Sequence, residues 1–243
     1  MHFPGVNTSP MYKYAPCILA PQMASKLICV TLGLHGMADV IANRFPHAIF
    51  LQIPSLHRNL SVVDFANTAF GKPCPALVYK DDEGVTARDV HLIKHGQAIE
   101  CMTNRRTAKE MSLPLTGNAR IPKYQAKPEI YIRNLAILPG NDNLQDMFTS
   151  IKDGFYLEHG YGSEGSIEGE YACHVKSGYR VKDGKIGQSI KGYCVWGFAL
   201  DFLRTISMIS DDFSWHPHEL FNLHGIEAAV GAPSIKACLN VGK

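Results

Sequence analysis

The run Pro16-Cys17-Ile18-Leu19-Ala20-Pro21 and the segment behind it decide how the N-terminal part of this chain folds. A short apolar run between prolines is typical of a strand, and a proline is tolerated in the first turn of a following helix. Behind it, apolar residues recur every three or four positions, as the buried face of a helix requires: Met23, Leu27, Val30 and Leu34. The sequence therefore predicts a strand over 16–20 that leads into a helix over 22–35.

The rest of the chain alternates between short β-rich runs, glycine-containing turns and a few helical segments. We expect strands at 60–63, 76–79, 90–93, 99–102, 130–138, 171–175, 179–181 and 234–241. We expect helices at 105–111 (capped by Asn104), 143–152 (ended by Gly154) and 198–209, and the strongest hairpin turn at 182–185. This order predicts one α+β domain over 15–243, a mostly antiparallel or mixed sheet built from hairpins with a few packed helices. Residues 1–14 are expected to form a loose arm.

Composition excludes several classes of protein. The 243 residues are 46% hydrophobic and 19% charged, which a disordered or collagen-like chain would not be. The net charge of +2 does not suggest nucleic acid as a partner, and no apolar run approaches the roughly 20 residues of a membrane span. Seven cysteines are scattered singly, and the start of the chain does not resemble a signal peptide. We expect a cytoplasmic protein with reduced thiols.

Three local patterns contain residues that could form a binding or catalytic site. Gly160-Tyr161-Gly162-Ser163-Glu164-Gly165 has dinucleotide-loop spacing, but strand-like residues follow it, which favours a flexible loop lining a groove. That groove would include Gly160, Gly162, Gly165 and Gly169. His216, His218 and His224 form the densest histidine cluster, which is either a metal site or a solvated loop. Asp81-Asp82-Glu83 is either a cation or acid–base site or a polar hairpin turn.

An ordered series of motifs resembles the TldD/PmbA family, the "modulator of DNA gyrase" proteins. The series comprises Tyr79–Val85, Leu92–Gly96, Asn104–Ala108, Thr116–Arg120, Arg133–Leu135, Pro139-Gly140, Lys152–Leu157, Lys182–Ile186, Gly231–Ile235 and Asn240–Gly242. The resemblance covers residues 16–243 and implies the C-terminal fold of that family, without the N-terminal α/β domain that its members carry. It implies cytosolic zinc metallopeptidases that cleave peptides or unfolded segments and work as dimers.

The resemblance also identifies the positions where family members hold zinc. Their helix carries two histidine ligands five positions apart and a glutamate that activates water. The matching positions here are Cys29, Leu34 and Val30, while Gly33, Ala38 and Asp39 are kept. The family's third ligand is a loop cysteine, and the corresponding region around His218 has none.

These departures predict a degenerate zinc site, no resident cofactor, and a non-catalytic or substrate-binding subunit. Its partner would be a second copy or a full-length TldD/PmbA-family subunit, and its ligand a peptide or unfolded segment. One alternative is an active zinc peptidase with a shifted set of three ligands. These would be Cys29, His35 and one loop histidine, which is His218, His216 or His224. Another is a decayed fragment without an independent role.

Overall fold

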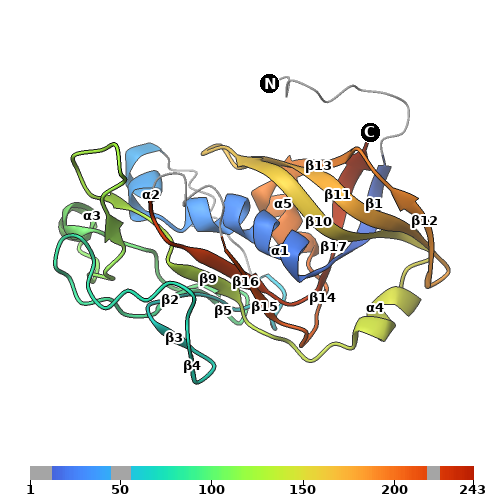
Figure 1. Ribbon diagram of the computed structural model, residues 1–243, viewed down its shortest axis with the longest axis horizontal. Helices are drawn as coiled ribbons and strands as arrows, with labels where there is room; N and C mark the ends of the chain where they lie inside the picture. The colour runs from blue at the N-terminus through green and yellow to red at the C-terminus, as the bar shows by residue number, and fades with distance from the viewer. Residues whose placement is uncertain (1–12, 45–55, 218–224) are drawn as a thin grey trace. The chain divides into compact units, whose positions relative to one another are not determined.

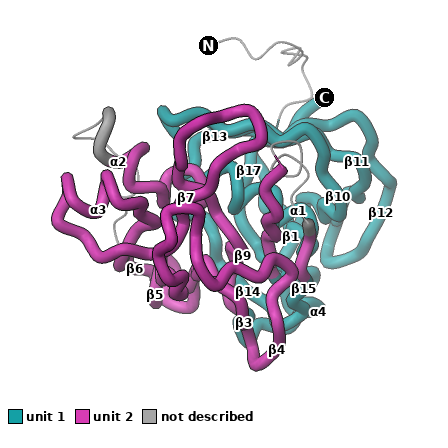
Figure 2. Tube along the Cα trace, turned by 60° about the vertical axis from the view of Figure 1, so that its left-hand side comes forward, with its two compact units in different colours: residues 1–31, 139–214, 233–243 teal, residues 32–138, 215–232 magenta. Residues whose placement is uncertain are grey.

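The computed structural model describes residues 13–44, 56–217 and 225–243 (Figure 1). They fall into two compact units, each assembled from separate stretches of the chain (Figure 2). Unit 1 comprises residues 1–31, 139–214 and 233–243, and unit 2 comprises residues 32–138 and 215–232. The arm expected at 1–14 lies outside the described residues except for Lys13 and Tyr14, which begin the first strand.

Unit 1 is built on a seven-stranded sheet. Its strands are β1 (Lys13–Leu19), β10 (Asp153–Gly165), β11 (Glu170–Lys182), β12 (Lys185–Ile190), β13 (Tyr193–Phe198), β14 (Met208–Ile209) and β17 (Ile235–Gly242). The order is β1-β10-β11-β13-β17-β14, with β12 paired to β11, and β1 also pairs with β17. That additional pairing closes β1, β10, β11, β13 and β17 into a ring, so none of these five strands is a free edge.

Helices cover parts of this sheet (Figure 1). Helix α1 (Pro21–Ile28) packs mainly against β10, and α5 (Ala199–Thr205) packs against β17 and β13. Helix α4 (Leu144–Thr149) supplies Met147 and Phe148 to a small core with Ile18 of β1 and Val181 of β11. Burial of these apolar side chains favours the folded state by roughly 1.5–3 kcal/mol each.

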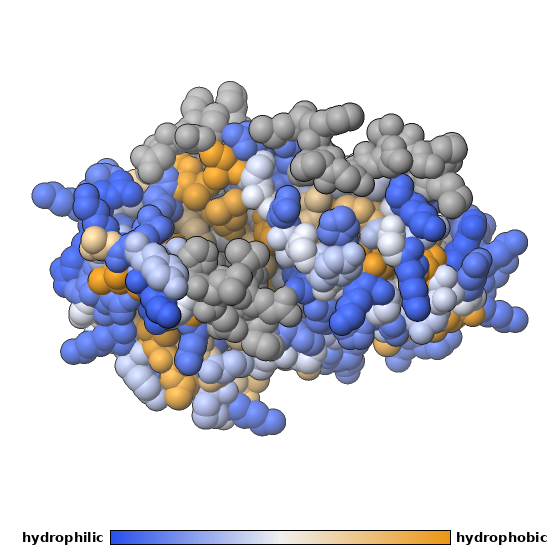
Figure 3. All heavy atoms as spheres, turned by 45° about the horizontal axis from the view of Figure 1, so that its top comes forward, coloured by the Kyte–Doolittle hydropathy of each residue, from blue (hydrophilic) through white to orange (hydrophobic). Residues whose placement is uncertain are grey.

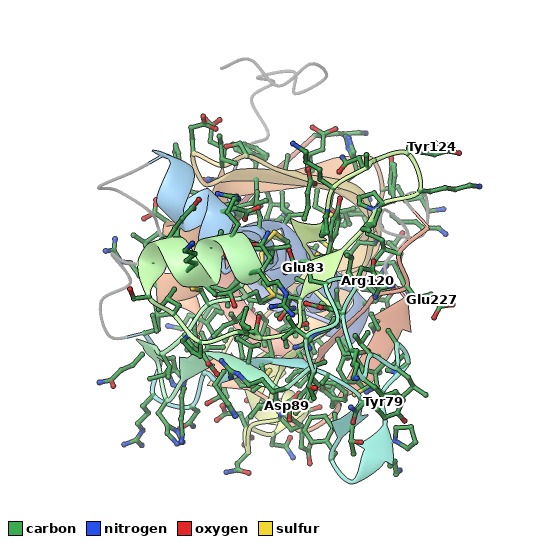
Figure 4. All side chains as sticks on the ribbon, turned by 90° about the vertical axis from the view of Figure 1, so that its left-hand side faces the viewer. Tyr79, Glu83, Asp89, Arg120, Tyr124 and Glu227 are labelled. Atoms are coloured by element: carbon green, nitrogen blue, oxygen red, sulfur yellow. The ribbon has the colours of Figure 1, made fainter. Side chains whose placement is uncertain are left out.

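Unit 2 contains a second sheet, of six strands. In spatial order they are β15 (Ser214–Pro217), β16 (Ala229–Ala232), β9 (Asn134–Ile137), β2 (Val62–Phe65), β5 (Val90–Lys94) and β6 (Gln97–Ala98). The described residues of this unit also form two small hairpins and two helices: β3 (Thr68–Ala69) with β4 (Lys72–Pro73), β7 (Ala119–Arg120) with β8 (Glu129–Ile130), α2 (Ala38–Arg44) and α3 (Arg105–Met111). On its surface the side chains of Tyr79 and Tyr124 are largely exposed (Figure 4).

Several predicted elements are confirmed. The strand over 16–20 and the helix behind it are present, and Asn104 caps α3 by accepting a hydrogen bond from the Thr107 amide at 2.9 Å. The turn between β11 and β12 has positive φ at both Asp183 (48°) and Gly184 (74°), as a tight type I′ hairpin requires. The α+β class is likewise confirmed.

Other predicted boundaries are wrong for identifiable reasons. Residues 76–79 form no strand, because the Asn134 side chain bonds both the amide (3.0 Å) and the carbonyl (2.7 Å) of Ala76 in place of a neighbouring strand. Gly154 does not end a helix; Ser150 ends α4, and Gly154 belongs to β10. The helix expected over 198–209 ends at Thr205, because Ser207 donates to Lys236 and the chain then joins β17 as β14.

Three β runs are also divided differently. Residues 130–138 split between β8 and β9, because the chain changes partners from β7 to β2 and β16. The runs 171–175 and 179–181 are one strand, β11. The strand that returns against β5 is 97–98 rather than 99–102.

Candidate functional site

The centre of the site is a helix that changes its winding. Strand β1 ends at Leu19, Ala20 donates to the Leu157 carbonyl at 2.9 Å, and α1 begins at Pro21. After Ile28 the helix becomes a π-helix over Cys29–Gly33. The Thr31 hydroxyl donates to the Leu27 carbonyl at 2.6 Å and gives that carbonyl a partner where the winding changes. The sequence pattern predicted the helix but not the π turn.

The π turn explains which residues share a side of this helix. In an α-helix, residues five apart point about 140° away from each other, because each residue advances the helix by about 100°. A π turn closes its hydrogen bonds from i to i+5, which brings residues five apart nearer to one side than an α-helix does. The π turn therefore moves positions 29 and 34 toward the same side of the helix. It also changes the buried face: Leu32 and His35 are buried, whereas Val30 and Leu34 are half-buried, contrary to the expected α-helical face.

The side chains at positions 29, 30 and 34 offer little reactivity at neutral pH. Cys29 is buried, with 6% exposure, and this burial raises the pKa of its thiol to about 12, against a smaller lowering by Lys26. The thiol is therefore protonated at neutral pH, and only a thiolate is a good nucleophile or metal ligand. Leu34 carries no lone pair, and Val30 has no group that accepts a proton.

Strand β10 crosses directly over this turn. A Cβ atom at Gly165 would overlap the carbonyl oxygen of Val30 and lie 3.1 Å from its Cβ. A Cβ atom at Gly160 would lie 2.7 Å from both the Met23 and the Cys173 sulfur atoms. These two glycines permit the strand to approach the helix. The expected flexible loop is therefore wrong for residues 160–165, which belong to β10.

Gly162 and Gly169 have a different role from these packing glycines. Their φ angles are +55° and +95°, so they occupy backbone conformations that most other residues avoid. Gly162 lies in a part of β10 where its register with β11 shifts, and Gly169 closes the turn between the two strands, where its amide donates to Ser166. Whether any of the four glycines lines a groove remains a prediction.

The candidate histidines are divided between described and undescribed parts of the chain. His35 is buried at 2% exposure two residues beyond the π turn, and His216 is half-buried in β15. His218 and His224 lie outside the described residues. Over 13–44, 56–217 and 225–243, no group of three or more His, Cys, Asp or Glu side chains is placed to hold a metal ion.

The acidic turn at 81–83 is occupied by structural hydrogen bonds. Asp81 accepts from the amides of Glu83, Val85 and Ala119 at 2.8–3.1 Å. The Glu83 carboxylate accepts from the Arg105 amide at 2.7 Å, next to the cap of α3. These contacts support the polar hairpin turn rather than a catalytic pair.

The sequence patterns do not predict the structural role of a second carboxylate, that of Asp212, which binds Ser234 in the Gly231–Ile235 motif. Asp212 accepts hydrogen bonds at 2.6 Å from both the amide and the hydroxyl of the buried Ser234, and it also contacts the Ser210 hydroxyl. Asp212 thereby holds the chain at the start of β17. No spacing signal identifies this pair, because 22 residues separate its members.

Comparison with known proteins gives this scaffold its family. Residues 12–242 match the family described as "PmbA/TldA metallopeptidase C-terminal domain". The chain therefore belongs to the TldD/PmbA metallopeptidase family and corresponds to its C-terminal domain. Among curated relatives, it is 34% identical over 203 residues to a zinc metalloprotease TldD homolog of Saccharolobus solfataricus, covering 82% of this chain and 44% of the relative. A Synechocystis metalloprotease is 25% identical over 92% of this chain and 49% of its own length.

Solved structures agree on the fold. TldE from Thermococcus kodakarensis superposes with a TM-score of 0.79 at 18% identity, over 96% of this chain and 51% of its own. A Thermotoga maritima protein described as a candidate modulator of a DNA gyrase gives 0.74 at 20% identity, over 98% and 51%. The chain spans about half the length of the relatives it matches. Within its described residues, no helix is long and apolar enough to cross a membrane.

Proposed function

We propose that this chain is a metallopeptidase-family domain with a degenerate zinc site, acting as a non-catalytic or substrate-binding subunit of a family dimer. The observation that carries this proposal is the set of side chains on the helix that leads into and through the π turn. Position 29 is a buried cysteine, position 30 a valine and position 34 a leucine.

A hydrolytic zinc needs three protein ligands and an open position for water, and each ligand must be deprotonated where it binds. Cys29 could supply one ligand and Leu34 none, so the three ligands are not present at these positions. Val30 stands where family members carry the water-activating glutamate, and general-base assistance is worth about 10²–10⁴ in rate. The missing ligands and the missing glutamate both predict a loss of hydrolysis, because a zinc ion held by other ligands would still lack a general base at position 30.

The proposed partner is a second copy of this chain or a full-length TldD/PmbA-family subunit, and the proposed ligand is a peptide or unfolded segment. The family assignment supports this part. A cytoplasmic location is proposed on the seven cysteines, all of which are free thiols.

Metal analysis of the purified protein after dialysis tests the proposal. We expect well under one zinc ion per chain. We also expect no chelator-sensitive cleavage of an unfolded protein substrate. Stoichiometric zinc that is lost in Cys29→Ser or His35→Ala, together with peptidase activity, would establish the shifted-ligand enzyme instead. Light scattering of the chain, alone and with a full-length family subunit, tests association; an unfolded chain that associates with neither would support the decayed fragment.

A further inference from the structure

A row of cross-strand partners defines one side of the sheet in unit 1. Ala172 pairs with Trp196, Trp196 with Asn240, and Asn240 with Tyr14. Directly opposed residues of neighbouring strands project to the same side of a sheet. The neighbours Val195 and Val241 project to the opposite side and are fully buried. The side that carries Tyr14 and Trp196 is therefore the outer one.

A gap in the sheet interrupts this outer side. Strand β13 pairs with β17 only as far as Asn240, and β14 pairs with β17 only at Ile235 and Lys236. Between them the Thr205 hydroxyl takes the place of a strand, because it donates to the Cys238 carbonyl and accepts from the Cys238 amide, each at 3.1 Å.

A cavity of about 430 Å³ opens at this gap. Three of its lining residues are aromatic side chains with part of their surface open to solvent: Tyr14 (56% exposed), Phe198 (52% exposed) and the half-buried Trp196. Aromatic rings are costly to leave in water, and an aromatic-lined hollow with a few polar groups is the common form of a ligand site.

One carboxylate, of Asp201, and one guanidinium, of Arg204, line the cavity beside the rings, and the Glu170 carboxylate lies on a neighbouring position. Asp201 lines the cavity, and its carboxylate contributes to the raised pKa of Tyr14, after the larger effects of burial and Cys238. Glu170 pairs with Phe198 across the neighbouring strand. Arg204 lies 3.9 Å from Asp201, but both side chains are about half or more exposed, and a pair of this kind exchanges readily.

We propose that this cavity binds a lysine or arginine side chain of a polypeptide. The cation would lie against the faces of Trp196 and Tyr14 and pair with Asp201 in place of Arg204, while the aliphatic stem of the side chain packs on Phe198. Ring faces attract cations through their quadrupole, and long basic side chains bury their stems on apolar surface. This site does not depend on the degenerate zinc site, since it uses none of its residues.

Trp196 itself provides the signal for the test. The chain has two tryptophans, so Trp215→Phe leaves Trp196 as the only one. In that background the fluorescence of Trp196 is titrated with short end-blocked peptides that differ at one central residue: lysine, arginine, norleucine or glutamate. We expect saturable binding of the lysine and arginine peptides, about tenfold tighter than the norleucine peptide.

Charge removal provides the matched variants. Asp201→Asn is expected to weaken the lysine peptide several-fold and leave the norleucine peptide unchanged, whereas Glu227→Gln, an equally simple loss of an exposed carboxylate in unit 2, changes neither. Circular dichroism confirms that the variants are folded, and calorimetry repeats the titration without the fluorescence signal.

Equal affinity for the lysine and norleucine peptides, stronger binding of the glutamate peptide, no saturable binding, or no effect of Asp201→Asn would each overturn the proposal. Zinc content and dimer formation are measured in separate experiments. Failure of the peptide titration therefore leaves the proposed function intact, and failure of the proposed function leaves the proposed peptide site intact.

Discussion

The guanidinium Nε of Arg133 lies 2.8 Å from a carboxylate oxygen of Asp64, and both side chains are completely buried. Asp64 also accepts from the amides of Arg133 and Asn134 and from the Asn118 side chain, all within 3.0 Å. Arg133 in turn donates to the carbonyls of Thr116, Gly117 and Arg88. One ion pair therefore joins two of the sequence motifs, Thr116–Arg120 and Arg133–Leu135, to strand β2 within unit 2.

Removing one member of this pair should destabilise the protein severely. Arg133→Met leaves the Asp64 charge buried without its partner, for which we expect a loss of about 3–5 kcal/mol in the free energy of unfolding. Urea denaturation measures it. The control is Arg106→Ala, which breaks an exposed pair with Glu110 and should cost about 0.5 kcal/mol or less. A loss in Arg133→Met no larger than in the control would contradict this role.

The close approach of β10 to the π turn predicts a steric effect at Gly165. Gly165→Ala should destabilise the protein by about 1–3 kcal/mol, because its Cβ would overlap the Val30 carbonyl and force the strand away. Gly187→Ala in β12 is the control, since its Cβ would lie 3.3 Å from the Arg180 carbonyl, its nearest neighbour. Thermal unfolding compares the two. Equal stability of the two variants would mean that β10 does not press on the helix.

The π turn predicts which histidine pairs can bind a metal. Cys29→His with Leu34→His places two imidazoles on one side of the helix, and we expect Zn²⁺ binding about tenfold tighter than in the unaltered chain. Cys29→His with Val30→His is the control, because adjacent positions on a helix do not face each other, and it should gain nothing. Calorimetric titration with zinc distinguishes the two pairs. Equal binding by both pairs would show that positions 29 and 34 do not share a side of the helix.

Buried thiols predict a loss of stability in alkali. Desolvation raises the pKa of the Cys29 and Cys173 thiols to about 12 from the ordinary thiol value of 9.0, so each keeps its proton in the folded state while the unfolded chain releases it. The unfolded state then binds fewer protons above pH 9, so stability must fall as pH rises from 9 towards 12. Each such thiol contributes a slope of about 1.4 kcal/mol per pH unit.

Denaturation of the protein and of Cys29→Ala at pH 8, 9 and 10 measures this slope. We expect Cys29→Ala to lose less stability than the unaltered chain between pH 9 and 10. Cys238→Ala is the comparison, because Cys238 is the least buried of the seven cysteines. Parallel curves for all three proteins would mean that the Cys29 thiol ionises normally.

Local patterns in the sequence determined much of the fold and the chemistry at the site. The proline-bounded strand, the helix behind it, the Asn104 cap and the Asp183-Gly184 turn follow from short-range preferences, which act within a few residues. That Cys29, Val30 and Leu34 offer neither a complete ligand set nor a base also follows from residue identity alone.

Only the tertiary structure decided the rest, because it depends on residues distant in sequence. The π turn lies beneath β10, whose glycines are needed for that contact and not for a loop. The Asn134 amide replaces a strand that the run at 76–79 would otherwise form. The ring of strands closes through pairing of β1 with β17, more than 200 positions apart in the chain. Hydrogen bonding and close packing between such segments outweigh the weak preference of each short run, so no reading of a single stretch could have found them.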